Sequence, residues 1–227
     1  MKLRWEVPLR ELPYLLGGAF LTLRIVGVAV LFGIILGILA AMGRTSKNKL
    51  AYGLASAYVE FFRNTPLLAQ IFFAYFGLPS LGIDLSPNQA ALSVIILNTG
   101  AYMTEIIRAG LESVHKSQIE SGWSLGMTYL QVFRYVILPP AMKAIAPPLS
   151  NQIISITLSS CVISQISAED LTFRAMILEN RTFRSFEIYI VTILIYFLMA
   201  QMLHLLFRWL NKRLFGITER KRLTTVI

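Results

Sequence analysis

Few residues in this chain have the types and spacing that chemistry needs, and no group of them suggests catalysis. The single cysteine, Cys161, excludes an internal disulfide, and the two histidines, His115 and His204, each stand apart from further metal ligands. No phosphate-binding G-x-x-x-x-G-K-[ST] sequence occurs. We therefore predict no catalytic residue, no metal site and no ATP bound by this chain.

Polar residues within apolar segments form a second candidate group. Asn98, Tyr102 and Glu105 are spaced i, i+4 and i+7, so they share one helical face. If these segments cross a bilayer, such groups either line a path for a polar solute or hydrogen-bond between helices. Hydrogen bonding is the simpler interpretation for most of them, and the two are evenly matched for Asn98 and Tyr102. The candidate path residues are Gln70, Asn98, Tyr102, Asn151, Gln152 and Ser155.

The composition is that of an integral membrane protein. Of 227 residues, 56% are hydrophobic and only 15% are charged, with a mean hydropathy of +0.63. A soluble domain carries about a quarter charged residues. The net charge of +9 therefore indicates orientation in a membrane and contact with lipid, and argues against binding of nucleic acid.

The apolar stretches predict an all-α transmembrane domain with five spans. Four of them are long enough to cross a bilayer as one helix, namely residues 12–42, 89–107, 144–166 and 187–210. The second span, within 50–78, is interrupted by Arg63, Asn64, Thr65 and Pro66. Proline should kink the chain there, and Asn64 suits a left-handed conformation. The single domain, 1–227, has a core of about 16–210, a polar loop at 169–186 and a basic tail at 211–227.

The basic residues predict the orientation of the spans. Arg44, Lys47 and Lys49, the stretch 108–143 and the tail fall on one side, and the cation-free loop 79–88 falls on the other. Because lysine and arginine mark cytoplasmic loops, we expect the N-terminus outside and the C-terminus in the cytoplasm.

An ordered motif lies in the stretch 108–143. Residues 120–126 read E-S-G-W-S-L-G, and nine residues later 136–139 read V-I-L-P. This order resembles the signature of ABC importer permeases, commonly written E-A-A, three residues, G, nine residues, I-x-L-P. Glu120, Gly126, Leu138 and Pro139 match it, while Ser121, Gly122 and Val136 replace two alanines and the isoleucine.

The resemblance implies a short cytoplasmic coupling helix that docks on a separate ATPase. Glu120 suits a charge-assisted contact, and Trp123 and Met127 suit apolar anchors. The alternative is a long amphipathic connection between spans. The candidate coupling segment, 115–127 with the later L-P pair, comprises Gln118, Glu120, Ser121, Gly122, Trp123, Gly126, Met127, Leu138 and Pro139.

Two further segments resemble the polar amino-acid permeases of the histidine, glutamate, glutamine, arginine and opine group. Residues 62–68 read F-R-N-T-P-L-L, close to that group's F-R-G-T-P-L-L, and residues 101–110 match its A-Y-x-x-E-x-x-R-x-G. Leu158 stands where the group often has lysine. This departure predicts that the chain pairs with a non-identical second permease.

The resemblance implies a type I ABC importer permease fold in a bacterial inner membrane. The implied solutes are polar amino acids, with basic amino acids and opine-like compounds among them. The implied partners are a second permease, two cytoplasmic ATPases that bind ATP and Mg²⁺, and an extracytoplasmic solute-binding protein. The alternative is an ion-gradient-driven transporter or channel, for which Glu105 is the one candidate carboxylate. A membrane-embedded enzyme ranks last.

Overall fold

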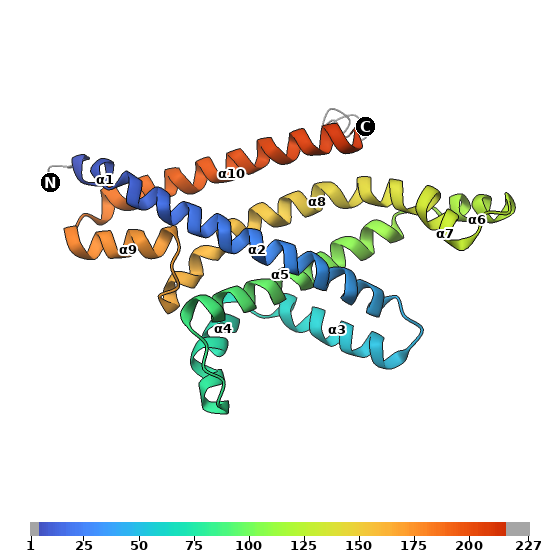
Figure 1. Ribbon diagram of the computed structural model, residues 1–227, viewed down its shortest axis with the longest axis horizontal. Helices are drawn as coiled ribbons and strands as arrows, with labels where there is room; N and C mark the ends of the chain where they lie inside the picture. The colour runs from blue at the N-terminus through green and yellow to red at the C-terminus, as the bar shows by residue number, and fades with distance from the viewer. Residues whose placement is uncertain (1–4, 217–227) are drawn as a thin grey trace, which may run out of the picture.

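The computed structural model describes residues 5–216, and all regular structure in that range is helical. Four long helices, α2, α5, α8 and α10, run along the length of the molecule, with α9 at one end and α6 at the other (Figure 1). The elements in chain order are α1 (Glu6–Arg10), α2 (Leu12–Arg44), α3 (Lys49–Asn64), α4 (Leu67–Phe72), η1 (Phe73–Gly77), η2 (Leu78–Leu81), α5 (Pro87–Glu112), α6 (Lys116–Ser124), α7 (Tyr129–Gln131), η3 (Val132–Ile137), α8 (Leu138–Ser159), η4 (Ser160–Ile166), α9 (Leu171–Thr182) and α10 (Ser185–Phe215).

Long-range hydrogen bonds fix the direction of each span. We call the two ends of the bundle the α9 end and the α6 end. At the α9 end, the amide of Leu171 donates to Thr22 in the first part of α2, and the amide of Glu169 donates to Asn88 at the start of α5. Therefore α2 and α5 run in the same direction, and α3 with α4 returns between them. Helix α8 then returns from α6, and α10 runs back, so the start of α1 and the end of α10 lie apart (Figure 1).

The predicted set of membrane helices is confirmed in its main features. Four helical segments are long and apolar enough to cross a membrane, Leu12–Arg44, Pro87–Glu112, Tyr129–Ile166 and Ser185–Phe215, and a shorter apolar one spans Leu67–Leu81. The break in the second span lies between Asn64, where α3 ends, and Leu67, where α4 begins. Asn64 itself is not left-handed as expected, because it completes the last turn of α3.

Small residues bring α2 and α5 into direct contact. An added Cβ atom at Gly33 would lie 2.8 Å from a Thr99 side-chain atom, and one at Gly37 would lie 2.6 Å from Cβ of Met103. The i, i+4 spacing of the glycines places both on the face that meets α5. This contact fixes the helix that carries Asn98, Tyr102 and Glu105 against the rest of the bundle.

We expect Gly37→Ala to destabilise the protein and Gly27→Ala to leave it unchanged or slightly more stable. At Gly37 the added methyl group forces α2 and α5 apart, at a cost of about 1–3 kcal/mol. At Gly27 nothing lies within 4 Å of the added atom, and alanine favours the helix by about 0.5–1 kcal/mol. Thermal unfolding of both purified variants measures the difference, and equal melting temperatures would contradict it.

The prediction of a polar loop at residues 169–186 is wrong, because most of it forms α9. Asp170 caps this helix by accepting a hydrogen bond from the amide of Phe173, at 2.6 Å. Helix α9 is stabilised by packing against α2, because its residues Leu171 and Ala175 are fully buried. Arg174 stacks on the Tyr14 ring and donates to the Tyr14 carbonyl oxygen. The periodicity of the buried residues was obscured by the charges on the other face.

Asp170 should make stability depend on pH. Burial raises its pKa to about 6, against about 3.9 in an unfolded chain. The protonated form therefore favours the fold, so this contribution is complete below about pH 4 and is lost as pH rises through 6. The upper limit is about 3 kcal/mol, from two pKa units. Asp170→Asn keeps the capping acceptor but cannot ionise. We expect the melting temperature of the wild type, relative to this variant, to fall between pH 4 and 7.5; parallel profiles would contradict this.

The expected boundary of the basic tail also needs correction. Helix α10 continues through residue 211 and ends at Phe215, followed by left-handed Gly216. The remaining tail, residues 217–227, lies outside the described residues.

Candidate functional site

Helix α6 ends in a tight backbone motif that depends on Gly126. The amide of Gly126 donates to the Trp123 carbonyl oxygen at 2.9 Å, and the amide of Met127 donates to the Gly122 carbonyl oxygen at 3.2 Å. Gly126 has φ +76°, a left-handed conformation in which glycine is strongly preferred. The glycine of the motif is thus required by the sharp reversal between α6 and α7.

The second small residue of the motif, Gly122, faces the protein and not the solvent. Gly122 is the one buried residue of α6, and a Cβ added there would lie 3.2 Å from Val132 and 3.4 Å from Val136, both in η3. Helix α6 therefore rests on the base of the long helical segment that continues into α8. Gly122 therefore allows α6 to pack closely on η3.

Segment η3 is a π-helix that leads into Pro139 of the motif and the adjacent Pro140. Pro139 and Pro140 lack amide hydrogens, so they cannot donate to the preceding turn, and the wider π-helix precedes this loss of regular bonding. Leu138 is half-buried and Pro139 is exposed. Tyr129–Ile166 nevertheless forms one helical segment, which connects α6 directly to the middle of the bundle.

The outer surface of the α6 end combines exposed apolar side chains with one acid. Glu120, Gln118, Ser121 and Trp123 are exposed, and Met127 is half-buried. Sequence reasoning missed the residues after the helix: Leu125 is 81% exposed, and Tyr129 and Leu130 are also largely exposed. The sequence signal for them was their place near the motif glycine, since Leu125 directly precedes Gly126 and the other two follow it within four residues. We call Glu120, Trp123, Leu125, Tyr129 and Leu130 the α6 patch.

A cavity of about 160 Å³ lies among α4, α5 and α8. It is smaller than the roughly 300–1,000 Å³ of pockets for drug-sized ligands, so it suits a small metabolite. The cavity is lined by Thr65, Leu67, Asn98, Tyr102, Gln152, Ser155, Ile156 and Ser159. Four of the six candidate path residues are among these, whereas Gln70 is buried behind the lining and Asn151 is exposed on α8.

Gln70 and Asn98 hold the break between α3 and α4 in place. The Gln70 amide nitrogen donates to the carbonyl oxygens of Phe62 and Thr65, at 3.0 and 3.1 Å, and to the Thr65 hydroxyl at 2.8 Å. Asn98 donates to the same Phe62 oxygen at 3.1 Å and to the Gln70 side-chain oxygen at 3.2 Å. These bonds satisfy the backbone groups that the break frees, so Gln70 is a structural residue and Asn98 is both structural and cavity-lining.

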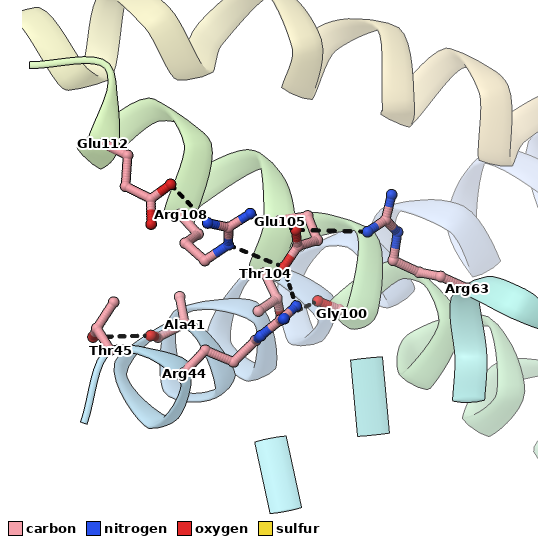
Figure 2. A network of polar contacts seen from close by, with 9 residues as sticks. All are labelled: Ala41, Arg44, Thr45, Arg63, Gly100, Thr104, Glu105, Arg108 and Glu112. Carbon is pink, nitrogen blue, oxygen red and sulfur yellow. Dashed lines mark hydrogen bonds and ion pairs between the residues drawn. The ribbon is translucent and has the colours of Figure 1, made fainter. Parts of the chain in front are cut away.

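Glu105 lies at the centre of a charged cluster that joins three helices (Figure 2). Arg44 from the end of α2 hydrogen-bonds to one carboxylate oxygen, and Arg108 from the next turn of α5 donates to the other at 2.9 Å. Arg63 from the end of α3 approaches the second oxygen to 3.6 Å. Arg108 also pairs with Glu112 at 2.6 Å. The side chain of Glu105 is only 17% exposed, so this cluster ties α2, α3 and α5 together.

Within residues 5–216, no group of three or more His, Cys, Asp or Glu side chains is placed to hold a metal ion.

Comparison with known proteins identifies the family of this chain. Residues 33–216 match the model of the family described as binding-protein-dependent transport system inner membrane component. The glutamine transport system permease protein GlnP of Escherichia coli (strain K12) is 36% identical over 217 residues, covering 94% of this chain and 99% of that protein. The arginine transport system permease protein ArtQ of Bacillus subtilis (strain 168) is 33% identical over 215 residues, covering 94% and 98%.

Solved structures agree with the sequence relatives. A crystal structure of an amino acid ABC transporter with histidines superposes with a TM-score of 0.89 at 36% identity, covering 94% of this chain and 100% of that one. The MetNI methionine ABC transporter, in an inward-facing conformation, has a TM-score of 0.71 at 19% identity, covering 88% and 96%, which supports the fold alone. The chain belongs to the family of inner membrane components of binding-protein-dependent transport systems, and its fold is that of a type I ABC importer permease.

Proposed function

We propose that this chain is the permease subunit of an ATP-driven importer of polar amino acids. The observation that carries the proposal is the α6 patch, an exposed apolar surface with one acid at the end of a helix fixed to the bundle core. Large exposed apolar residues at a polar end of a membrane protein favour a protein partner. The relatives named for glutamine, arginine and cystine transport support an amino acid as the solute.

The partner at the α6 end is a cytoplasmic ATPase in this proposal. Two such subunits bind ATP and Mg²⁺ and hydrolyse the nucleotide, and this chain performs no reaction of its own. Basic residues gather at the α6 end, including Arg44, Lys47 and Lys49 where α2 connects to α3, and Lys212 and Arg213 in the last turn of α10. They support a cytoplasmic α6 end, a cytoplasmic C-terminus and an N-terminus on the outer side. The solute-binding protein then docks at the α9 end.

A second permease completes the translocation path. The cavity-lining residues Ser155 and Ser159 are exposed on one face of α8, and Leu158 beside them is 41% exposed. An exposed polar face on a membrane helix is costly against lipid, so it suits a path enclosed by another subunit. We propose that this subunit is not identical, because Leu158 replaces the lysine that the resemblance implies.

The structure favours no role for Glu105 in ion-driven transport. A carboxylate that carries an ion needs a position free to bind and release it, whereas Glu105 has three arginine partners. No relative or solved structure reported above supports a secondary transporter.

Uptake by the reconstituted complex tests the proposal. The permease, its co-purifying ATPase and the binding protein are placed in proteoliposomes, and labelled L-glutamine, L-arginine and L-cystine are offered in turn. We expect uptake of at least one of them to require internal ATP and to persist when proton and sodium gradients are collapsed. Uptake that follows an ion gradient at constant ATP would overturn the proposal.

A further inference from the structure

None of the described residues that line the cavity is charged. This lack of charge matters for the proposed solutes. An α-amino acid carries both an ammonium and a carboxylate group. A carboxylate taken out of water is costly unless it is paired with a cation and hydrogen-bonded. The hydroxyl and amide groups of the lining supply polar contacts, but the solute carboxylate still requires a counter-charge.

Arg63 lies beside the cavity and carries such a charge. Its guanidinium carbon is 5.4 Å from the centre of the Tyr102 ring, and Tyr102 lines the cavity. Arg63 is also only two residues before Thr65, another lining residue. Its side chain is 39% exposed, more than that of Arg44 or Arg108.

Arg63 is also the weakest of the three partners of Glu105. Its nitrogen lies 3.6 Å from the carboxylate, beyond hydrogen-bonding distance, whereas both Glu105 oxygens are already hydrogen-bonded by Arg44 and Arg108. Glu105 therefore keeps close partners when Arg63 moves. Arg44 and Arg108 lack this freedom, because each is hydrogen-bonded to a carboxylate.

The backbone beside Arg63 is anchored, whereas its guanidinium makes only the long Glu105 contact and the contact with the Tyr102 ring. The carbonyl oxygen of the preceding residue, Phe62, accepts hydrogen bonds from both Gln70 and Asn98. The guanidinium can thus turn from Glu105 towards the cavity without moving the break between α3 and α4. A planar guanidinium binds a carboxylate through two parallel hydrogen bonds.

We propose that Arg63 binds the α-carboxylate of the solute in this cavity, and that the cavity takes amino acids with an uncharged side chain. The second part follows from this chain's share of the lining, which offers no carboxylate to a cationic side chain. The inference rests on the proposed function. Arg63 then exchanges Glu105 for the solute, so occupancy of the cavity loosens one of the three contacts that join α2, α3 and α5.

Binding to the assembled permease–ATPase complex in nanodiscs, without binding protein or ATP, tests the inference. The probes are L-glutamine, L-arginine and L-glutaminamide, in which a neutral amide replaces the α-carboxylate. We expect the wild type to bind L-glutamine at least tenfold more tightly than either other probe. Arg63→Gln should weaken L-glutamine binding tenfold or more and leave L-glutaminamide binding unchanged. Arg63→Lys, which keeps the charge but loses the two parallel bonds, should recover part of the loss.

Arg44→Gln is the matched control, because it removes another arginine partner of Glu105. It should change the binding of L-glutamine and L-glutaminamide by the same factor. Equal weakening of both probes by Arg63→Gln would show a structural role only and overturn the inference, as would no effect, tighter binding of L-arginine, or no binding of L-glutamine to the wild type. Failure of the proposed function is separate, since it is read from ATP-dependent uptake by the wild type.

Discussion

Glu120→Arg should release the ATPase from the permease and abolish ATP-driven uptake while the permease itself stays folded. Glu120 is exposed on α6, and no ion pair involves it within residues 5–216. Its removal therefore costs the isolated permease little. In the complex, a hydrogen bond to a charged group contributes about 1.5–3 kcal/mol, and reversal of the charge adds repulsion. We expect the affinity for the ATPase to fall about 100-fold, since each 1.4 kcal/mol is a factor of about ten.

Co-purification from solubilised membranes measures this effect, with the melting temperature of the permease recorded in parallel. Glu169→Arg is the matched control, because it makes the same change of charge at an exposed position at the α9 end. The control should retain the ATPase. Retention by Glu120→Arg as well would show that the α6 patch is not the docking surface, and absence of an ATPase from the wild type would remove the proposed function.

The surface around Glu120 also shows where sequence reasoning stopped. The resemblance to the permease signature implied a short helix here, and α6 followed by left-handed Gly126 has that form. The direction in which each residue faces was not predictable, because a nine-residue helix has too few apolar positions to define a buried side. Gly122 therefore proved to be the buried contact to η3, and Leu125 proved to be exposed.

The membrane spans were also easier to predict than the segments that connect them. Long apolar runs such as residues 12–42 and 187–210 predicted α2 and α10 well, because the bilayer requires about 20 apolar residues in a helix. Helix α9 was missed because its stability comes from a few contacts with α2, a tertiary effect that leaves only a weak periodicity in a charged segment. The cavity could be predicted only in part. The sequence placed Asn98 and Tyr102 on one helical face, but their proximity to Gln152 depends on how α5 packs on α8.

Glu105→Gln should destabilise the permease more than any single change of an exposed charge. It removes the one carboxylate that Arg44, Arg63 and Arg108 share and leaves three guanidinium groups around a neutral amide (Figure 2). Removal of one partner from a largely buried ion pair costs about 3–5 kcal/mol, because the remaining charge is uncompensated. We expect a loss at or below the lower limit, because the three arginine side chains are 16%, 39% and 29% exposed and remain partly solvated. Thermal unfolding of the purified permease measures it.

Glu112→Gln is the matched control, because it makes the same substitution on the same helix and also removes a partner of Arg108. Glu112 is exposed, so its loss should cost no more than about 1 kcal/mol. Equal melting temperatures for the two variants would contradict the structural role of Glu105. A Glu105→Gln protein with wild-type stability that loses only a response to an ion gradient would instead identify Glu105 as an ion carrier. The two interpretations therefore predict opposite results, because a carboxylate that holds three helices together cannot be neutralised without weakening the fold.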